Sequence, residues 1–361
     1  MSLSVSVRKR LSASFSLDVS FTAPPGITIV FGASGSGKTT LLRCLAGLAR
    51  PDAGRIAIGQ QVVFDSAEGR HVQAHRRNVG YVFQQLALFP HMSVAHNLEY
   101  GLARESSDVR RARTRAIAES LRISHVLGRK PAAISGGERQ RAALARSLVT
   151  DPSLLLLDEP LTALDHVAQT RIIEDLRSWN AAHGIPILYV THAHREVFAL
   201  GERVIVLDQG RLAAEGTPYD VMETPAHEPL ARLAGFENFF DTRVGTRRTE
   251  AGTMLCRLEA TNAELEVPLS ETPTGSRVRV AIRAGDILLA TEEPRGLSAR
   301  NILLGRLISL TREGTTSIAE VDAGARFVVR LTPSACESLG LAIGDRVWLI
   351  IKTHSCRIVS T

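Results

Sequence analysis

Apolar and polar residues alternate along much of this chain, and the spacing of the apolar ones predicts its first elements. Residues 11–21 carry an apolar side chain at every second position, which is the period of a strand with one buried face. Pro24-Pro25-Gly26 then predicts a turn into an apolar, β-branched strand over 27–31. Helical apolar spacing over 40–48 predicts a helix soon after that strand.

Strands and helices continue to alternate as far as about residue 236. Strands are predicted at 55–58, 61–64, 79–83, 154–157, 187–190, 203–207 and 211–215. Helices are predicted between about 103 and 127 and over 139–148, so the pattern indicates an α/β fold. The segment 85–102 is apolar without a clean strand period, and we interpret it either as core or as a partner-binding surface.

The remainder of the chain, roughly 238–361, has the pattern of an all-β region. It is rich in Val, Ile, Thr, Gly and Arg, with turns predicted at 312–314 and 322–324. The stretch 275–283 is similar to 344–352, a weak internal repeat that suggests two similar half-barrels. Coincidence is the alternative explanation of a repeat this short.

Length and composition bound the class of protein. A chain of 361 residues predicts one large domain of ~230 residues and a smaller one. No apolar run approaches the ~18 residues that a membrane span needs, and Met1-Ser2-Leu3-Ser4 does not resemble a secretory signal, so we expect a cytoplasmic protein. The four cysteines lack C-x-x-C spacing, which argues against a zinc site or a disulfide framework.

The formal net charge of +6 does not by itself select a partner. Nucleic acid, an anionic membrane surface and simple solubility would all fit it. The Arg-rich stretch 104–122 resembles the solvated face of a helix with Ile117 and Leu121 turned inward. No aromatic residues interleave with it for base stacking, so we expect no nucleic-acid partner.

Between the strand at 27–31 and the helix after it lies a glycine-rich loop with the spacing G-x-x-x-x-G-K-[ST]. Its glycines let backbone N–H groups converge on phosphate oxygens, Lys38 adds a charge for the outer phosphates, and Thr39 offers a hydroxyl to Mg²⁺. A plain glycine-rich turn before a helix is the alternative. The predicted site for a nucleotide triphosphate and Mg²⁺ comprises Gly32, Ala33, Ser34, Gly35, Ser36, Gly37, Lys38, Thr39 and Thr40.

Ser135-Gly136-Gly137-Glu138 opens the helix predicted over 139–148. Ser135 and Glu138 have the spacing of a capping box, so one interpretation is a capped helix with no further role. Two adjacent glycines beside a helix N-terminus also allow a ligand to approach the backbone. The second interpretation is therefore that these residues bind an anion.

Carboxylates and a histidine follow two of the buried strands. Asp158 and Glu159 end the strand at 154–157, where they are either solvated or, behind a phosphate loop, a Mg²⁺ ligand and a water-activating base. Pairing with Lys38 favours the functional interpretation. His192 follows the strand at 187–190, and on its own it would be assigned a structural role.

These motifs, together with Gln84 and Ala163-Leu164-Asp165, resemble those of the ABC-transporter ATPases in order and approximate spacing over residues 1–235. The resemblance implies a P-loop α/β domain with an antiparallel β subdomain and a helical subdomain. It also implies that Thr39, Gln84 and Asp158 serve Mg²⁺, that Glu159 is the catalytic base, and that His192 contacts the terminal phosphate. Ser135, Gly136, Gly137, Glu138 and Asp165 would join the nucleotide site.

Two positions depart from the family pattern. Ile134 and Glu138 stand where the family most often has leucine and glutamine, a change that keeps the cap and should keep ATP binding. Many members stack an aromatic residue on adenine. Only Phe15 is near enough here, and we interpret it as part of the apolar face of the strand at 11–21.

The resemblance also implies partners, because the signature of one ABC subunit closes on the nucleotide of another. One phosphate loop and one signature in the chain imply a homodimer with ATP between the copies. Separate integral-membrane permease subunits would bind at 85–102, and a periplasmic molybdate-binding protein would act indirectly. The expected location is the cytoplasmic face of the inner membrane, as a peripheral protein.

The end of the chain resembles the small β-barrel that binds molybdate in molybdate-handling proteins, a Mop/TOBE-like, OB-like domain. The similarity lies in Ser298-Ala299-Arg300-Asn301, in 331–334 and in 350–353. The predicted division is an ATPase domain at 1–235, a connecting β-region at 236–292 and this barrel at 293–361. Predicted oxyanion ligands are Ser298, Arg300, Asn301, Lys352 and Thr353, the alternative being that the charges are simply solvated.

Together the two resemblances imply the ATPase subunit of an importer for molybdate or tungstate. The same machinery with sulfate, ferric iron, polyamine or sugar as cargo is the second hypothesis. A soluble ABC ATPase that acts on nucleic acid or ribosomes is the third, and the lack of a long coiled-coil insertion or a second cassette disfavours it.

Overall fold

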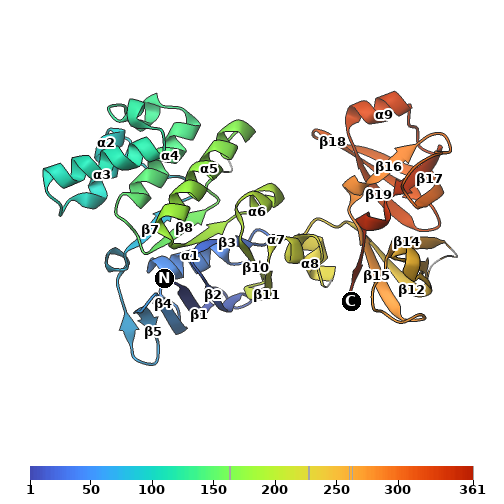
Figure 1. Cartoon of the computed structure of the whole chain (residues 1–361), viewed down its shortest axis with the longest axis horizontal. Helices are drawn as coiled ribbons and strands as arrows, with labels where there is room; N and C mark the ends of the chain where they lie inside the picture. Colours follow the sequence, from blue (N-terminus) through green and yellow to red (C-terminus); the bar gives the residue numbers. More distant parts are fainter. Residues whose placement is uncertain (162–163, 227, 260, 262, 361) are drawn as a thin grey trace. The chain divides into compact units, whose positions relative to one another are not determined.

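The computed structural model describes residues 1–161, 164–226, 228–259, 261 and 263–360, and it divides into two compact units, Met1–Tyr219 and Asp220–Thr361 (Figure 1). Ala163, in the predicted Ala163-Leu164-Asp165 motif, lies outside the described residues. Among the helices of the described part, none is both long and apolar enough to cross a membrane. The predicted domain limits at 235 and 292 stay predictions.

The first unit is built on a sheet with the strand order β6-β5-β4-β1-β2-β11-β10-β3-β9-β8-β7. Its strands are β1 (Leu3–Arg10), β2 (Ser16–Ala23), β3 (Gly26–Phe31), β4 (Ala53–Ile58), β5 (Gln61–Asp65), β6 (Arg70–His71), β7 (Val79–Val82), β8 (Leu154–Asp158), β9 (Pro186–Val190), β10 (Arg203–Asp208) and β11 (Arg211–Gly216). Strands β3, β7, β8, β9 and β10 run parallel, whereas β1, β2, β4 and β5 pair antiparallel. The predicted α/β fold with an antiparallel subdomain is therefore confirmed.

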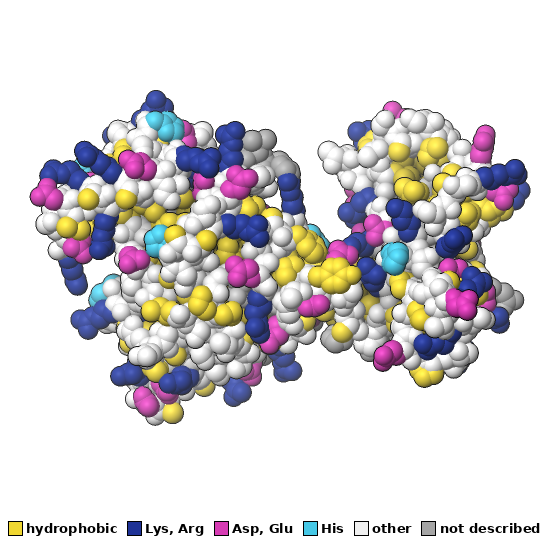
Figure 2. Space-filling model, viewed as in Figure 1, with side chains coloured by type: hydrophobic (Ala, Val, Ile, Leu, Met, Phe, Trp, Pro, Cys, Tyr) yellow, Lys and Arg dark blue, Asp and Glu magenta, His cyan; other side chains and the backbone are white. Residues whose placement is uncertain are grey.

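Some helices of this unit lie against the sheet, and the others form a separate group at one end. They are α1 (Lys38–Ala46), α2 (Val94–Glu99), α3 (Ser107–Ser120), α4 (Gly136–Leu148), α5 (His166–His183) and α6 (His194–Leu200). Figure 1 shows α2, α3 and α4 gathered together as the helical subdomain. Strand β8 is buried along its whole length, as expected for a parallel strand covered on both faces. On the face seen in Figure 2, basic and acidic side chains of this unit are interspersed.

The predicted strand at 11–21 is wrong in its first half. Residues 11–15 form the turn between β1 and β2, in which the Leu11 N–H donates to the Phe15 carbonyl (3.0 Å) and the Ser12 hydroxyl accepts the N–H of Phe15 (3.0 Å). The serine hydroxyl offers the backbone a local alternative to the sheet, which periodicity alone does not detect. The alternation holds from Leu17 onward, where the odd-numbered positions are buried.

The second unit contains two antiparallel sheets of the same plan, with orders β14-β13-β12-β15-β21 and β19-β18-β17-β20-β16. Their strands are β12 (Asn238–Arg248), β13 (Thr253–Leu258), β14 (Glu264–Pro268), β15 (Arg277–Ile282), β16 (Ile287–Ala290), β17 (Asn301–Glu313), β18 (Thr316–Asp322), β19 (Arg326–Leu331), β20 (Arg346–Ile351) and β21 (Cys356–Val359). Short helices α7 (Pro218–Met222), α8 (Glu228–Leu233) and α9 (Pro333–Leu339) accompany them. The all-β prediction for 238–361 is confirmed apart from α9 and short 3-10 turns, because α7 and α8 lie before residue 238.

The internal repeat predicted from the sequence is confirmed and extends over both sheets. The strands β12 to β16 correspond in order to β17 to β21, and the last strand of each set is exchanged. Strand β16 pairs with β20, and β21 pairs with β15. The two sheets also share one hydrophobic core, in which Phe240 and Phe327 lie with ring centroids 4.5 Å apart.

Two asparagines at corresponding positions tie the two sheets together. Asn238, at the start of β12, exchanges two hydrogen bonds with the backbone of Val328 in β19 (2.7 and 2.9 Å). Asn301, at the start of β17, does the same with Glu266 in β14 (2.6 and 2.9 Å). Both side chains are buried, so each amide satisfies the backbone of a strand in the opposite sheet.

Candidate functional site

The glycine-rich loop joins β3 to α1 and has the conformation that its glycines permit. Gly32, Gly35 and Gly37 have φ of 153°, 83° and 103°, which side chains with a Cβ disfavour. A Cβ on Gly32 would lie 2.2 Å from the Leu207 carbonyl oxygen. The Ser36 hydroxyl is buried and has no hydrogen-bond partner among the described residues, so the loop holds a polar atom that a bound phosphate could satisfy.

Lys38 is buried at the first position of α1. Its Nζ donates to the carbonyl oxygens of Gly32 and Ala33, both at 2.8 Å. Burial lowers the pKa of Lys38, while the nearby carboxylates of Glu159 and Asp158 act in the opposite direction. The ammonium group is thus enclosed by the loop that precedes it.

Asp158 ends β8 with its side chain almost fully buried. Its Oδ1 accepts a hydrogen bond from the Thr39 hydroxyl (3.2 Å) and its Oδ2 accepts one from the Tyr81 hydroxyl (3.1 Å). Burial raises the pKa of Asp158, and these two hydrogen bonds offset part of that rise. Asp158 and Thr39, far apart in the sequence, are brought into direct contact.

Glu159 lies between the ends of three parallel strands. Its carboxylate accepts a hydrogen bond from Gln84 Nε2 (3.3 Å), just past β7, and lies 3.2 Å from His192 Nδ1, just past β9. Its φ of 46° is unusual for a residue with a side chain, and its N–H donates to the Val190 carbonyl (3.1 Å). Three predicted residues thus converge on one point.

A cleft of about 540 Å³ opens over the loop. It is lined by Leu11, Phe15, Ser34, Gly35, Gly37, Lys38, Thr39, Thr40, Gln84 and Glu159. This volume suits a nucleotide-sized ligand. The interpretation of Phe15 as part of a strand's apolar face is wrong, because Phe15 lies in the turn between β1 and β2 and borders this cleft.

The predicted signature residues make their contacts elsewhere. Ser135 caps α4 in a full capping box with Glu138. Glu138 also lies 2.8 Å from His125 Nε2, and the Ser135 hydrogen bonds together with His125 lower the pKa of Glu138 to about 2. Gly136 and Gly137 lie near Leu164 and Ala168. The Asp165 carboxylate accepts the N–H of Ala168 (3.0 Å) and so caps α5.

The donor set near Asp158 fits Mg²⁺. A hydroxyl (Thr39), a carboxylate (Asp158) and the amide of Gln84 are hard oxygen donors, and Mg²⁺ in phosphate sites takes few protein ligands beside water and phosphate. The described residues contain no cluster of three His, Cys, Asp or Glu side chains that would hold a metal on its own. A site that is completed by phosphate oxygens is consistent with both observations.

The predicted oxyanion residues differ in how the structure uses them. Ser298, Arg300 and Lys352 are exposed, and Thr353 is buried. The prediction that Asn301 binds an oxyanion through its side chain is wrong, because its amide oxygen accepts from Glu266 N–H and its amide nitrogen donates to the Glu266 carbonyl and Cys356 Sγ. These contacts leave the Asn301 amide without a free donor.

Sequence reasoning missed Tyr81, His125 and Arg146. Arg146, in α4, donates to the carbonyl oxygens of Leu86 and Ala87 in the turn after Gln84. None of the three belongs to a motif. Their partners are distant in sequence, so only the position of Tyr81 on the strand leading to Gln84 could have drawn attention to it.

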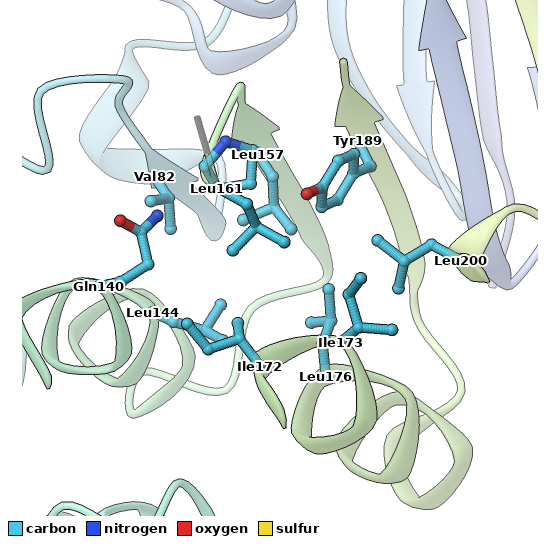
Figure 3. A pocket seen from close by; sticks show the side chains of 11 residues that line it. Val82, Gln140, Leu144, Leu157, Leu161, Ile172, Ile173, Leu176, Tyr189 and Leu200 are labelled. Atoms are coloured by element: carbon cyan, nitrogen blue, oxygen red, sulfur yellow. The ribbon is translucent and has the colours of Figure 1, made fainter. Parts of the chain in front are cut away.

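Helix α4 also borders a small cavity of about 10 Å³ between β7, β8, β9 and α5 (Figure 3). Figure 3 shows mostly apolar side chains from these elements around it, together with the amide of Gln140 and the hydroxyl of Tyr189. Gln140 Nε2 is buried without a hydrogen-bond partner among the described residues. Toward α5, helix α4 makes an ion pair between Arg141 and Asp175 (3.6 Å).

Comparison with known families gives two matches. The ABC transporter family model matches residues 17–162, and the TOBE domain model matches residues 297–358. The first range includes the glycine-rich loop, Gln84, Ser135 and Glu159, and the second includes the exposed Ser298, Arg300 and Lys352.

Curated relatives are similar over almost the whole chain. The molybdenum import ATP-binding protein ModC of Rhizobium etli is 41% identical over 98% of this chain and 99% of its own length. ModC 1 of Azotobacter vinelandii is 38% identical over 94% of each chain. The solved dimeric structure of the ATP-binding cassette MJ0796 in a post-hydrolysis state with ADP and Pi is 28% identical, with a TM-score of 0.51, and spans 60% of this chain and 99% of that one.

Proposed function

Since this chain belongs to the ABC transporter family, among the molybdenum import ATP-binding proteins, we propose that it hydrolyses ATP as the energy-coupling subunit of a molybdate importer. The observation that carries the proposal is the convergence of Gln84, Glu159 and His192 beside the loop of Lys38 and Thr39. A nucleotide triphosphate in this cleft would have its terminal phosphate next to a carboxylate.

The roles of the loop residues follow from their chemistry. Backbone N–H groups of 33–39 and the N-terminus of α1 bind phosphate oxygens, and Ser36 gains a partner for its buried hydroxyl. Lys38 exchanges the carbonyl oxygens of Gly32 and Ala33 for the outer phosphates. Thr39, Asp158 and Gln84 would hold Mg²⁺, which supplies charge neutralisation on the phosphates.

Glu159 is proposed as the general base. Its carboxylate orients the attacking water and accepts its proton, while His192 and Gln84 hold that carboxylate in place from two sides. The ring of His192 is more than half exposed, so it can also reach a terminal phosphate. Leu11 and Phe15 would contact the base of the nucleotide, the aromatic ring by stacking.

A second copy of the chain would complete the site. Ser135, Gly136, Gly137 and Glu138 make their described contacts with His125, Leu164 and Ala168 and do not line the cleft of their own chain. The cassette MJ0796, which has a similar fold, is described as a dimer. We therefore propose a homodimer in which the α4 N-terminus of one copy approaches the nucleotide of the other.

The chain works at the cytoplasmic side of a membrane, bound to permease subunits. We propose the inner membrane, with 85–102 as the docking segment. The exposed Tyr100 and half-buried Leu86, Leu88 and Phe89 support this, while Val94 belongs to the core. A periplasmic molybdate-binding protein would deliver the cargo to those permease subunits.

The repeat in the second unit supports an oxyanion site in its second half. Arg300 precedes Asn301 as Glu237 precedes Asn238, and Lys352 directly follows β20 as Arg283 directly follows β15. In the first half the positions are filled internally, because Arg283 pairs with Glu223 (3.1 Å) and the Ala284 N–H donates to Glu237 (2.9 Å). In the second half the corresponding cations are exposed.

We propose that molybdate binds there through Ser298, Arg300, Lys352 and Thr353, with Asn301 shaping the loop. The whole chain is titrated with molybdate and with sulfate by calorimetry. Heat and thermal stabilisation with molybdate and much less with sulfate are expected, because a smaller anion leaves donors unpaired. Equal responses to molybdate and sulfate would indicate an importer ATPase with a different cargo.

The transport function itself is tested with the complete transporter in vesicles. ATP-dependent uptake of molybdate that fails in the Glu159→Gln variant is the expected result. Uptake of sulfate or iron in place of molybdate would identify a different cargo. Uptake without ATP would contradict the proposed role as the energy-coupling subunit.

A further inference from the structure

The turn that follows Gln84 is held in an unfavourable conformation. Leu86 and Ala87 have φ of 59° and 49°, so two consecutive residues with side chains occupy the left-handed region. The turn has some bonds of its own, from Leu86 N–H to the Phe83 carbonyl (2.8 Å) and from Ala87 N–H to the Gln85 carbonyl (2.6 Å). Such a conformation persists only where the surroundings enforce it.

Arg146 supplies that enforcement from the last turn of α4. Its Nη1 donates to the Ala87 carbonyl oxygen (2.7 Å) and its Nη2 to the Leu86 carbonyl oxygen (3.1 Å). The same guanidinium lies over the ring of Phe89, with 5.5 Å from Cζ to the centroid. One planar group therefore contacts two backbone carbonyls and one aromatic ring at the same time, which a lysine could not do.

The turn in question lies between two functional segments. On one side it follows Gln84, whose amide contacts Glu159. On the other side it leads into the rest of the segment 85–102, where Phe89 packs against Tyr100 (4.6 Å between centroids) and Asn97 binds the Phe89 backbone in both directions. A change in the turn must move one segment relative to the other.

Helix α4 connects this turn to the signature. Its N-terminus is capped by Ser135, and Arg146 lies at its other end. Beyond Arg146, its neighbour Ser147 donates to the Tyr81 carbonyl of β7 (3.0 Å). Elsewhere α4 meets the sheet across the apolar cavity of Figure 3, where such bonds are few, so its polar attachment to β7 and the following turn is concentrated at this end.

We propose that Arg146 is a positioning residue that fixes the turn after Gln84, holds Gln84 against Glu159, and links the signature helix to the segment 85–102. The proposal rests on the proposed ATPase function, since hydrolysis is one of its readouts. Arg146 is not among the residues that line the cleft over the phosphate loop. It acts through the backbone of Leu86 and Ala87.

The test compares Arg146→Met, which removes the donors and keeps the length, with Arg146→Lys, which keeps the charge but not the fork. Ser147→Ala is the matched control, because it removes a bond from the same helical turn to β7 and none to the turn after Gln84. For each full-length variant, kcat and KM for ATP are measured with Mg²⁺. Amide hydrogen exchange of 85–92 is followed in parallel.

We expect Arg146→Met to lower kcat about tenfold with KM within twofold, since Gln84 is misplaced while the phosphate loop is intact. Exchange at 85–92 should accelerate about tenfold. Arg146→Lys should lie between Met and wild type, and Ser147→Ala should match wild type in both measurements. If the Arg146→Met variant does not fold, the comparison of Arg146→Lys with Ser147→Ala tests the proposal.

Wild-type kcat together with wild-type exchange in Arg146→Met would overturn the proposal. So would an equal loss in Ser147→Ala, because it would assign the effect to general loosening of α4. An inactive wild-type chain would contradict the proposed function instead. The exchange comparison would then still decide on Arg146.

Discussion

The Tyr81 hydroxyl donates a hydrogen bond to the Asp158 carboxylate, with 3.1 Å between Oη and Oδ2. Tyr81 lies on β7 and Asp158 at the end of the adjacent strand β8, so the bond crosses between neighbouring parallel strands. It is one of two side-chain hydrogen bonds that offset part of the rise that burial causes in the pKa of Asp158, the other coming from Thr39. In the proposed Mg²⁺ site, these two hydrogen bonds would orient the Asp158 carboxylate toward the cation.

Tyr81→Phe should therefore weaken Mg²⁺ binding and shift the acid limb of the pH profile of ATPase activity to higher pH. Burial already raises the pKa of Asp158, and loss of a donor raises it further, so more of the carboxyl is protonated at a given acidic pH. A hydrogen bond to a charged group contributes about 1.5 kcal/mol, or roughly tenfold in Mg²⁺ half-saturation. An unchanged pH profile would exclude this role for Tyr81.

Glu159→Gln should abolish steady-state hydrolysis and leave ATP binding intact. In the proposed mechanism the Glu159 carboxylate orients and deprotonates water and does not hold phosphate. The variant should accumulate as an ATP-bound dimer, which size-exclusion chromatography with and without Mg²⁺ and ATP detects. Glu174→Gln, on the exposed face of α5, serves as the control. Normal turnover in Glu159→Gln would remove Glu159 from the mechanism.

Lys38→Ala should weaken nucleotide binding itself. A charge that faces the outer phosphates is lost from a buried position, and one such contact is worth several kcal/mol in enclosed phosphate sites, on the order of a hundredfold in Kd. Fluorescent-nucleotide titration measures it, with the exposed Lys130→Ala as control. Equal ATP affinity in the two variants would argue against this loop as the phosphate site.

Glu138 should make the first unit sensitive to acid. Its pKa of about 2 lies below the ordinary 4.5, so its contribution to folding is complete above pH 4.5 and is lost as the pH falls from 4.5 toward 2. Glu138→Gln should be less stable than wild type at pH 5, and the difference should shrink by pH 3. Urea unfolding at both pH values checks this. A difference that is independent of pH would contradict it.

Lys352→Ala should lower molybdate affinity at least about tenfold, since a charge-assisted contact is removed from an anion site. Arg283→Ala, at the corresponding position of the first half, should keep molybdate affinity but lower the melting temperature, because it loses its ion pair with Glu223 and its hydrogen bond to the Met222 carbonyl. Calorimetry and thermal unfolding separate the two. Loss of binding in both variants would place the anion elsewhere.

Local sequence was sufficient for the phosphate loop, the buried strand β8 and the capped start of α4, because spacing and composition there act over a few residues. It failed at 11–15, where a serine hydroxyl overrides the alternation, and so misassigned Phe15. The contacts of Tyr81 with Asp158 and of His125 with Glu138 depend on which strands and helices become neighbours. Asn301 looked like a ligand because its distant partner Glu266 could not be known.

The exchange of β16 and β21 has a consequence for how such a unit can be divided. Residues 293–360 alone would lack β16 beside β20 and would leave β21 without β15. Because β21 follows β20 as β16 follows β15, a second copy of the same fragment offers the missing strand and receives one in return. The excised half should therefore assemble as a symmetric pair with swapped ends. The intact second unit therefore corresponds to such a pair with its two halves joined by the connecting peptide. Because the halves are covalently linked, their assembly does not depend on protein concentration.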